Sequence, residues 1–540
     1  MIGVSLPYSW LTGESRVPKL DVDKTLVTLK EEGVSQIELR TILPHHDPDE
    51  VLRISDMLGE RGFSVSIHSY MHTRESAVKD VFSPLSRLLE GRREVRTVIV
   101  LHLLDEDNAP ILRSLAEYAE QKGYNVVIAA ENNRLMPNGK EGDCAEFVLD
   151  AVTRADHRSV GICFDLGHYI YYVKKHGLYP EKTLPRVEFL DKIVHTHIHA
   201  LDGLKTHFPL PACELPLSEM LEPFSYKYFG AYNLELDFPR LEGLFDPEDA
   251  LVGSVHHLLS HLPPLAKLYR RIRLEYKNDL SRALSVYGEK TEGTLMSLAN
   301  PTFYLFNTGG YLWAMDPAFR FVNYLTDAKD HIAVQMKDVS LMVVTHEHVD
   351  HFEEEAVREL AKTEMTWIIP DFMYEAALRW GIRPKKIIVA HKNQPICIDK
   401  LTFLPFEGRH FRPVTKKGVP AYGYYVTAEG SPSMAFPTDV RDFSLDGLPE
   451  LPSADVVFSH VFLGDGAAND SDFGDKPEEV ARFLLHFSKK HIVFAHLYEN
   501  GRRYEDMWRP EHARLIADAA LSHYPDLRIS IPEVGDHILL

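Results

Sequence analysis

The stretch Val343-Val344-Thr345-His346-Glu347-His348-Val349-Asp350-His351 places three imidazoles and a carboxylate within six positions, directly after an apolar run. An apolar run that stops in a polar loop is typical of a buried strand. Without a cation these groups would be costly to desolvate, whereas a divalent metal binds neutral imidazole and carboxylate. We therefore expect His346 and His348 to face one metal ion, and Asp350 and His351 to face a second. A solvated histidine-rich turn is the alternative.

The H-x-H-x-D-H motif resembles the metallo-β-lactamase superfamily, as do the strand pair before it and the Asp316-Pro317 ending of that pair. The resemblance covers residues 295–540 and implies three more ligands downstream. The matching positions are His410, Asp439 and His496. The implied arrangement has His346, His348 and His410 on one ion, Asp350, His351 and His496 on the other, and Asp439 as the bridge. His410 departs from the family pattern, because Gly408-Arg409-His410-Phe411 replaces the usual glycine-flanked histidine.

The chemistry that this resemblance implies is hydrolysis. A divalent ion lowers the pKa of bound water towards neutrality and polarises an ester or phosphoryl oxygen. Asp350 would orient the nucleophile as well as bind metal. His460, in Phe458-Ser459-His460, is a candidate to bind substrate, with a structural role as the alternative. The long inserts and overall plan look most like the branch that contains ascorbate-6-phosphate lactonase, which implies a sugar lactone as substrate.

Residues 1–262 alternate short β-rich runs with amphipathic helical segments, which is the pattern of βα units around a parallel sheet. Eight strands, each followed by a helix, in about 260 residues match the size of a (β/α)8 TIM barrel. A doubly wound open sheet is the alternative. The expected strands are Ile2–Leu6, Gln36–Arg40, Ser64–His68, Thr97–Leu103, Asn125–Glu131, Val160–Asp165, Ile193–His199 and Asn233–Asp237.

Polar residues close four consecutive strands of this expected barrel, at Glu131, Asp165, His199 and Glu235. The functional groups of a TIM barrel lie at the C-terminal ends of its strands. Any one of these residues alone would more often be a capping or salt-bridged side chain. Together they form a ligand set suited to Mn²⁺, Mg²⁺ or Zn²⁺. The sequence therefore predicts a metal site at the barrel mouth.

This half resembles the xylose-isomerase-like superfamily of sugar-phosphate isomerases and epimerases. The matching segments are Ala130-Glu131-Asn132, Phe164-Asp165-Leu166-Gly167-His168, His197-Ile198-His199-Ala200-Leu201-Asp202 and Leu234-Glu235-Leu236-Asp237. The resemblance implies that Glu131 and Glu235 bind metal and shuttle a proton at a carbon next to a carbonyl. His199 is preferred to His197 as the ligand because it stands three positions before Asp202, as in the family pattern. Both histidines alternate to the same face of the strand, so an error of one pair stays open.

Further side chains follow other strands of the expected barrel. In the epimerase branch, His68, His102 and His168 would contact substrate. Tyr8 and Trp10, after the first strand, would line the pocket. For each of these residues a purely structural role is the alternative.

The same superfamily contains endonuclease IV, which is the source of an alternative function. That branch uses extra histidines for a three-metal phosphodiesterase site, and His68, His102, His168 and His207 could supply some of them. However, Lys205 stands where that branch has an aspartate. The formal net charge of -20 over 540 residues also disfavours a nucleic-acid partner.

The sequence also bounds the environment and division of the chain. It has no basic leader with an apolar segment and no run of about 18 apolar residues, so we expect a cytoplasmic protein without membrane spans. Four cysteines lie far apart, which suits reduced thiols. They are Cys144, Cys163, Cys213 and Cys397. The expected division is a barrel over 1–262, a basic helical connector over 263–294 and a hydrolase domain over 295–540.

The resulting hypothesis is a fused carbohydrate enzyme. The barrel would isomerise or epimerise a sugar or sugar phosphate, and the second domain would hydrolyse a sugar lactone or related ester, each with Zn²⁺ or Mn²⁺, or with Mg²⁺ in the barrel. The expected partner is this small-molecule substrate, and a homo-oligomer is compatible with the sequence. One alternative is a phosphodiesterase built from two hydrolytic metal sites. Another is a hydrolase whose non-catalytic barrel serves as a binding scaffold.

Overall fold

The chain divides into two compact units, Met1–Lys267 and Leu268–Leu540. Each unit is described by itself. The computed structural model describes all residues except 18–19, 94, 140–141, 180–182, 213–214, 279–293, 319–335, 412–415, 462, 464–475, 500–501 and 503–506. Cys213 and the later part of the expected connector therefore lie outside the described residues.

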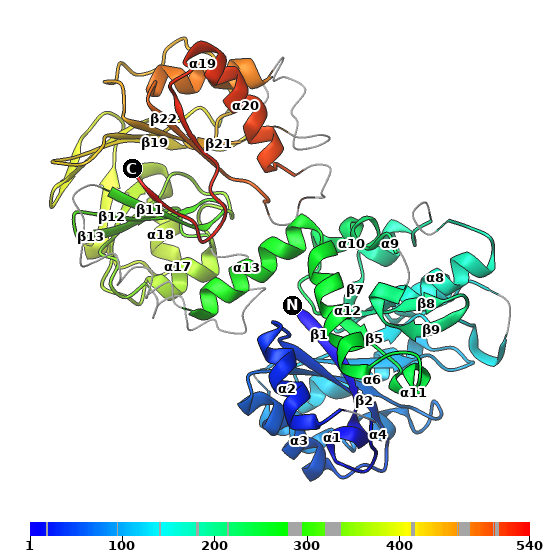
Figure 1. Cartoon of the computed structure of the whole chain (residues 1–540). Coiled ribbons are helices and arrows are strands. Elements are labelled where there is room, and N and C mark those ends of the chain that lie inside the picture. The colour runs from blue at the N-terminus through cyan, green and yellow to red at the C-terminus, as the bar shows by residue number, and fades with distance from the viewer. Residues whose placement is uncertain are drawn as a thin grey trace. The chain divides into compact units, whose positions relative to one another are not determined.

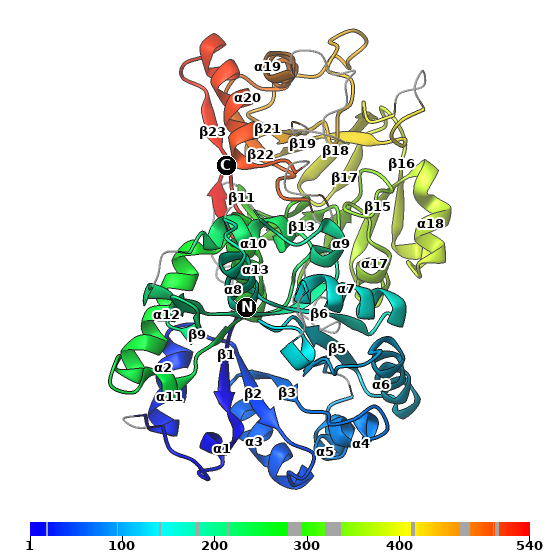
Figure 2. The same ribbon diagram turned by 90° about the vertical axis from the view of Figure 1, so that its right-hand side faces the viewer.

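In the first unit, eight described strands close into a parallel barrel with the order β1-β10-β7-β6-β5-β4-β3-β2 (Figure 2). The closed order confirms the predicted TIM barrel and excludes an open doubly wound sheet. The strands are β1 (Ile2–Pro7), β2 (Gln36–Ile42), β3 (Ser64–Ser69), β4 (Thr97–His102), β5 (Val126–Glu131), β6 (Val160–Asp165), β7 (Ile193–Ile198) and β10 (Tyr232–Glu235). A hairpin of β8 (Ala200–Asp202) and β9 (Lys205–Phe208) follows β7.

Helices lie outside this barrel, as α3 and α6 do in Figure 2. Aspartates before several of them accept backbone N–H groups, as Asp143 does at α7 and Asp246 at α12, and so satisfy donors that the helix leaves unpaired. The helices are α1 (Tyr8–Leu11), α2 (Val22–Glu31), α3 (Pro48–Glu60), α4 (Ala77–Phe82), α5 (Ser86–Gly91), α6 (Ala109–Lys122), α7 (Cys144–Ala155), α8 (Leu166–Lys175), α9 (Val187–Leu190), α10 (Leu217–Ser225), α11 (Phe238–Leu241) and α12 (Pro247–His261). Their apolar faces are buried with the barrel strands in one hydrophobic core.

The second unit contains two seven-stranded sheets among its described residues. The first has the order β16-β15-β14-β13-β12-β11-β24 and the second the order β17-β18-β19-β20-β21-β22-β23. The first sheet comprises β11 (Thr294–Asn300), β12 (Phe303–Thr308), β13 (Tyr311–Met315), β14 (Leu341–Val343), β15 (Thr366–Pro370), β16 (Ile387–Ala390) and β24 (His537–Leu539). The second comprises β17 (Ile396–Ile398), β18 (Leu401–Glu407), β19 (Tyr422–Ala428), β20 (Met434–Phe436), β21 (Val456–His460), β22 (His491–Ala495) and β23 (Arg528–Ser530).

The two sheets pack face to face through aromatic side chains. Tyr304 of β12 meets Phe458 of β21 with ring centroids 5.3 Å apart, and Trp313 of β13 meets Phe403 of β18 at 5.3 Å. Helices α17 (Glu354–Leu360) and α18 (Tyr374–Arg379) lie beside the first sheet, and α19 (Lys476–Phe487) and α20 (Pro510–His523) beside the second (Figure 1). The unit is therefore an αββα sandwich with an aromatic core between its sheets.

Three other features bear on the expectations. Helix α13 (Pro264–Asn278) contains the boundary between the two units. Cys144, Cys163 and Cys397 are free thiols. Among the described helices, none is both long and apolar enough to span a membrane.

Candidate metal centres

The metal motif of the second unit lies where several strands end. Its loop follows β14, and His410 follows β18. Asp439 follows β20, and His496 comes directly after β22. Because the side chains of these loops converge at one end of the sandwich, residues far apart in sequence become neighbours.

The first predicted ligand set is brought together. His346, His348, His410 and Asp439 each offer a ligand atom, and these atoms all lie within 4.8 Å of one another. Nε2 of His410 lies 3.0 Å from Nδ1 of His348, and Nε2 of His346 lies 3.6 Å from Oδ2 of Asp439. Nitrogen and oxygen atoms at these separations can share one ion.

The second predicted set lies on the other side of Asp439. Nε2 of His496 is 3.0 Å from Oδ2 of Asp350, and Nε2 of His351 is 3.3 Å from Oδ1 of Asp439. Nε2 of His351 is also 3.9 Å from Oδ2 of Asp350. Asp439 therefore faces both sets, with one oxygen toward His346 and the other toward His351, as a bridging ligand would.

The residues present fit a divalent cation. Nε2 of His346 and Nε2 of His351 are buried, and neither has a hydrogen-bond partner among the described residues. Burial lowers the pKa of His346 to about 4 and that of His410 to about 2, so both rings are neutral near pH 7. A buried, neutral imidazole whose nitrogen faces a carboxylate without a hydrogen bond, as Nε2 of His346 faces Asp439, is a ligand that a metal ion satisfies.

Asp316 supports this centre, and the sequence analysis noted it only as a strand ending. Its carboxylate accepts the backbone N–H of Thr345 at 2.8 Å and the Thr345 hydroxyl at 2.7 Å. It also accepts Nδ1–H of His351 at 2.8 Å. With the proton on Nδ1, the lone pair of His351 is on Nε2, the atom that faces Asp439.

His460 also holds Asp439, through the oxygen that faces His351. Its Nδ1 donates to Oδ1 of Asp439 at 2.7 Å, and its Nε2 accepts from the Tyr304 hydroxyl at 2.9 Å. The residue was predicted to bind substrate, and the structure shows both of its ring nitrogens engaged within the protein. This geometry favours the structural alternative.

Backbone strain marks the same region. Asp316, Thr438 and His496 have φ values of 57°, 61° and 61°, in the left-handed region that residues other than glycine rarely adopt. Each lies directly after or within two residues of a strand end. Such strain persists where surrounding contacts enforce it, and it clusters at functional sites.

The centre of the barrel contains the three predicted carboxylates. Oε2 of Glu235 and Oε1 of Glu131 lie 3.2 Å and 3.4 Å from Nδ1 of His197, and Oδ2 of Asp165 lies 4.0 Å from the same nitrogen. Burial opposes ionisation of Glu131 and Glu235, but the nearby imidazoles hold the pKa of each well below its usual value. The nitrogen that faces all three carboxylates therefore belongs to His197.

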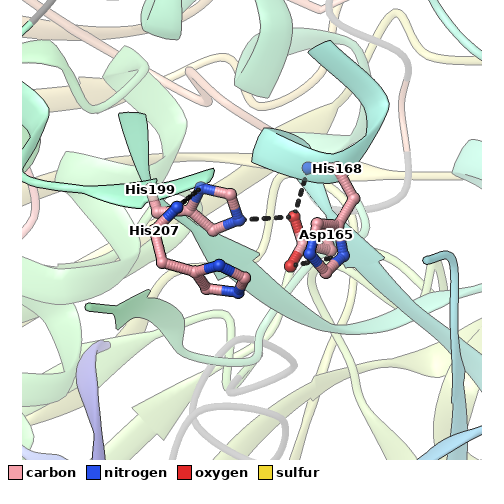
Figure 3. A group of neighbouring side chains, drawn as sticks. All are labelled: Asp165, His168, His199 and His207. Carbon is pink, nitrogen blue, oxygen red and sulfur yellow. Dashed lines mark hydrogen bonds and ion pairs between the residues drawn. The ribbon is translucent and has the colours of Figure 1, made fainter. Parts of the chain in front are cut away.

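His199, the nitrogen ligand predicted from the sequence, lies in a neighbouring group with Asp165, His168 and His207 (Figure 3). Its Nε2 is 3.2 Å from Oδ1 of Asp165, and its ring stacks on that of His207 with centroids 4.2 Å apart. Nδ1 of His168 is 3.1 Å from Oδ2 of Asp165. Asp165 thus belongs to both groups, because its Oδ2 also lies 4.0 Å from Nδ1 of His197.

The other predicted barrel residues divide into two sets. Nε2 of His102 and Nε2 of His68 lie 3.0 Å and 3.4 Å from Oε2 of Glu131, so both border the centre. Tyr8 and Trp10 are buried, and the Tyr8 ring packs on that of His46 at 4.6 Å.

This centre also fits a divalent cation. Among the described residues, buried atoms without a hydrogen-bond partner gather here. They are Nδ1 of His68, both carboxylate oxygens of Glu131, Oδ2 of Asp165, Nδ1 of His197, Nε2 of His199 and Oε2 of Glu235. Buried carboxylate oxygens and imidazole nitrogens that face one another at these distances are a ligand set that a divalent cation satisfies.

The sequence analysis missed Glu38 of β2 and His195 of β7. Glu38 is fully buried and accepts from His195 and His197. The sequence signal for Glu38 is a charged residue in the middle of a strand that is expected to be buried. A buried carboxylate needs buried hydrogen-bond partners, so such a residue indicates a polar cluster inside the barrel.

Comparison with known proteins bears on the second unit first. Residues 315–497 match the family model described as a beta-lactamase superfamily domain. This unit has a metallo-β-lactamase fold. The match supports a metal-dependent hydrolase, and it leaves the branch within the superfamily open.

A curated relative matches only a short part of the chain. An uncharacterized protein of Methanocaldococcus jannaschii is 43% identical over 65 residues, which are 12% of this chain and 23% of that protein. The match thus spans under a quarter of the relative's length.

Solved structures are similar to each unit at low identity. The metallo-β-lactamase-fold protein YhfI of Bacillus subtilis is 16% identical, covering 45% of this chain and 99% of its own, with a TM-score of 0.32. A xylose isomerase domain protein of Alicyclobacillus acidocaldarius is 14% identical, covering 49% of this chain and 100% of its own, with a TM-score of 0.34.

Proposed function

We propose that the protein is a bifunctional metal-dependent carbohydrate enzyme. The metallo-β-lactamase unit would hydrolyse a sugar lactone or related ester, and the barrel would isomerise or epimerise a sugar or sugar phosphate. The observation that carries the proposal is that each unit buries its own set of imidazoles and carboxylates with their ligand atoms close together, and that several of these atoms have no hydrogen-bond partner among the described residues.

In the hydrolase unit, His346, His348 and His410 would hold one ion, Asp350, His351 and His496 the other, and Asp439 both. A bound divalent ion supplies an activated water and polarises the scissile carbonyl. Asp350 is the ligand suited to orient that water, because its side chain is 21% exposed whereas that of Asp439 is 3% exposed. His496, 3.0 Å from Oδ2 of Asp350, fixes the direction of this carboxylate.

In the barrel, Glu131, Asp165 and Glu235 would hold the ion together with a histidine of the β7 end. A bound ion stabilises negative charge on a substrate oxygen next to the reacting carbon. Glu131 and Glu235 approach the centre from different strands, so one carboxylate can take a proton from that carbon while the other returns it. Their side chains are 0% and 6% exposed, which limits exchange of that proton with water.

A phosphodiesterase is the second candidate function of the barrel, and one observation favours it. His68 and His102 both face Oε2 of Glu131, the oxygen opposite the one that faces His197. Those three residues can hold a further ion beside the first, with Glu131 shared. Adjacent ions that share a carboxylate suit displacement at a phosphodiester.

The proposal is tested by assaying the metal-loaded full chain on sugar lactones, on ketose phosphates and on a phosphodiester such as bis(p-nitrophenyl) phosphate. We expect Asp350→Asn to reduce lactone hydrolysis at least about 100-fold and to leave isomerase activity unchanged. We expect Glu235→Gln to have the reverse effect. Phosphodiester cleavage that Glu235→Gln abolishes would support the second candidate instead. A lactonase unaffected by Glu131 and Glu235 substitutions, with no barrel activity on any substrate, would indicate a scaffold.

A further inference from the structure

Glu38 forms a buried hydrogen-bonded cluster inside the barrel. Its carboxylate accepts from the Ser5 hydroxyl at 2.9 Å, from Nε2 of His195 at 2.9 Å and from Nε2 of His197 at 3.0 Å. Glu38, His195 and His197 are all fully buried. An ionised carboxylate only accepts hydrogen bonds, so both imidazoles present Nε2–H to it.

This contact determines which nitrogen of His197 is available as a ligand. A neutral imidazole with its proton on Nε2 has its lone pair on Nδ1. Nδ1 of His197 faces Glu131, Asp165 and Glu235, as described above. The nitrogen and the three facing oxygens have no hydrogen-bond partner among the described residues. Carboxylate oxygens from three strands therefore lie within 4.0 Å of one nitrogen from a fourth strand.

His199 is held differently. Its Nδ1 lies 2.9 Å from the backbone nitrogen of His207 and 3.2 Å from the carbonyl oxygen of Ala200, so backbone groups on both sides hold this nitrogen, and Nε2 is the other edge of the ring. That Nε2 faces Oδ1 of Asp165, and this oxygen already accepts the backbone N–H of His168 at 2.6 Å at the start of α8. Nε2 of His199 therefore faces one carboxylate of the centre, whereas Nδ1 of His197 faces three.

The backbone holds His199 in this arrangement. His207 has φ of 67°, and its carbonyl accepts the backbone N–H of Asp237 at 3.2 Å. The stacked His207 ring covers His199 on one side, and Gly167 packs against it so closely that a Cβ there would lie 2.0 Å from Cε1 of His199. The hairpin of β8 and β9 thus fixes which edge of the His199 ring faces Asp165.

We propose that Glu38 is a positioning residue that keeps the proton of His197 on Nε2, and that Nδ1 of His197 is thereby the nitrogen ligand of the central barrel ion. Glu131, Asp165 and Glu235 complete the set, and His199 positions Asp165. Of the proposed function, the inference requires only that the barrel binds metal. It differs from the family pattern, which places the ligand at His199.

The direct test is crystallography of the full chain loaded with Mn²⁺, with anomalous diffraction to locate the ion. We expect an anomalous peak within bonding distance, about 2.1 Å, of Nδ1 of His197. A peak bonded to Nε2 of His199, with His197 out of bonding distance, would overturn the inference, as would the absence of metal from the barrel. This readout is independent of activity, so an inactive barrel with Mn²⁺ on His197 would refute the proposed function and support this inference.

Variants test the role of Glu38. We expect His197→Ala to abolish the tight Mn²⁺ site of the barrel in titrations followed by electron paramagnetic resonance, and His199→Ala to retain it. Glu38→Gln should weaken Mn²⁺ binding roughly 10–100-fold and change the spectrum of bound Co²⁺, because the tautomer of His197 is no longer fixed.

The matched control is Gln36→Ala. Gln36 lies in β2, as Glu38 does, and the substitution removes its buried hydrogen bond to Ser66 of β3. A purely structural role for Glu38 would make Glu38→Gln behave like this control, with lower stability and unchanged Mn²⁺ affinity and Co²⁺ spectrum. That result would contradict the positioning role.

Discussion

At the residue scale, single carboxylates outside the two ligand sets determine the orientation of the ligand histidines. Asp316 accepts from both donors of Thr345 and from His351, and its left-handed backbone places it directly after β13. A carboxylate that accepts a hydrogen bond from the ring nitrogen not facing the metal fixes the tautomer and orientation of a ligating histidine. Asp316 in the hydrolase unit and Glu38 in the barrel thus act on their histidines in the same way.

We predict that Asp316→Asn lowers the Zn²⁺ affinity of the hydrolase unit roughly 10–100-fold, because the amide cannot accept all three hydrogen bonds that the carboxylate accepts. Competition with a chromophoric chelator measures this affinity. Asp338→Asn, at an exposed position of the same unit, is the control and should leave it unchanged. Equal affinities for the two variants would contradict a role of Asp316 in aiming His351.

The sequence motifs predicted which types of side chain bind metal. The two-residue period of a strand limited how exactly each ligand could be assigned to one position. The three barrel carboxylates converge as the strand ends indicated. The sequence could not separate His197 from His199, because residues two apart on a strand share a face, and only the carboxylates that each ring nitrogen faces distinguish them. Glu38 has no motif around it, so its role emerges only when β2 and β7 close into one barrel.

At the element scale, tight packing between α8 and the end of β7 requires glycine. Cβ of an alanine at 167 would overlap the His199 ring, which His207 already covers from the other side. We predict that Gly167→Ala destabilises the barrel by about 1–3 kcal/mol, as overpacking a core does. Urea unfolding followed by tryptophan fluorescence measures this change.

Gly253→Ala is the control for this substitution. Gly253 lies in α12, and its added Cβ would meet Pro211 Cγ at 3.7 Å, an ordinary contact. Alanine in a helix is more stable than glycine by roughly 0.5–1 kcal/mol, so this variant should be as stable as the wild type or more stable. Destabilisation of both variants to the same extent would show that the His199 contact is not the cause.

Buried strands could be predicted from the sequence more readily than exposed ones. All eight barrel strands could be predicted because strands covered on both faces form continuous apolar runs between polar segments. Three strands of the second unit, β17, β23 and β24, have three residues each, and their burial is intermediate to exposed, so they carry little hydrophobic pattern. Their positions depend on pairing with neighbouring strands, which a local pattern does not reveal.

At the scale of the whole molecule, each unit buries its own set of carboxylates and imidazoles. We therefore expect bound metal to stabilise the folded state of each unit. Binding that favours the folded state adds about 4 kcal/mol when free metal exceeds its dissociation constant 1,000-fold. We predict that EDTA lowers the midpoint of thermal unfolding of each unit, and that added Zn²⁺ or Mn²⁺ restores it. Identical calorimetric profiles with and without EDTA, in protein shown to contain metal beforehand, would contradict this.

Metal analysis of the purified full chain, with one ligand removed from each unit in turn, tests the central claim most directly. We predict that His346→Ala lowers the molar metal content of the second unit only, that Glu131→Ala lowers that of the barrel only, and that the losses add in the double variant. A wild type without bound metal, or variants with unchanged metal content, would contradict the account.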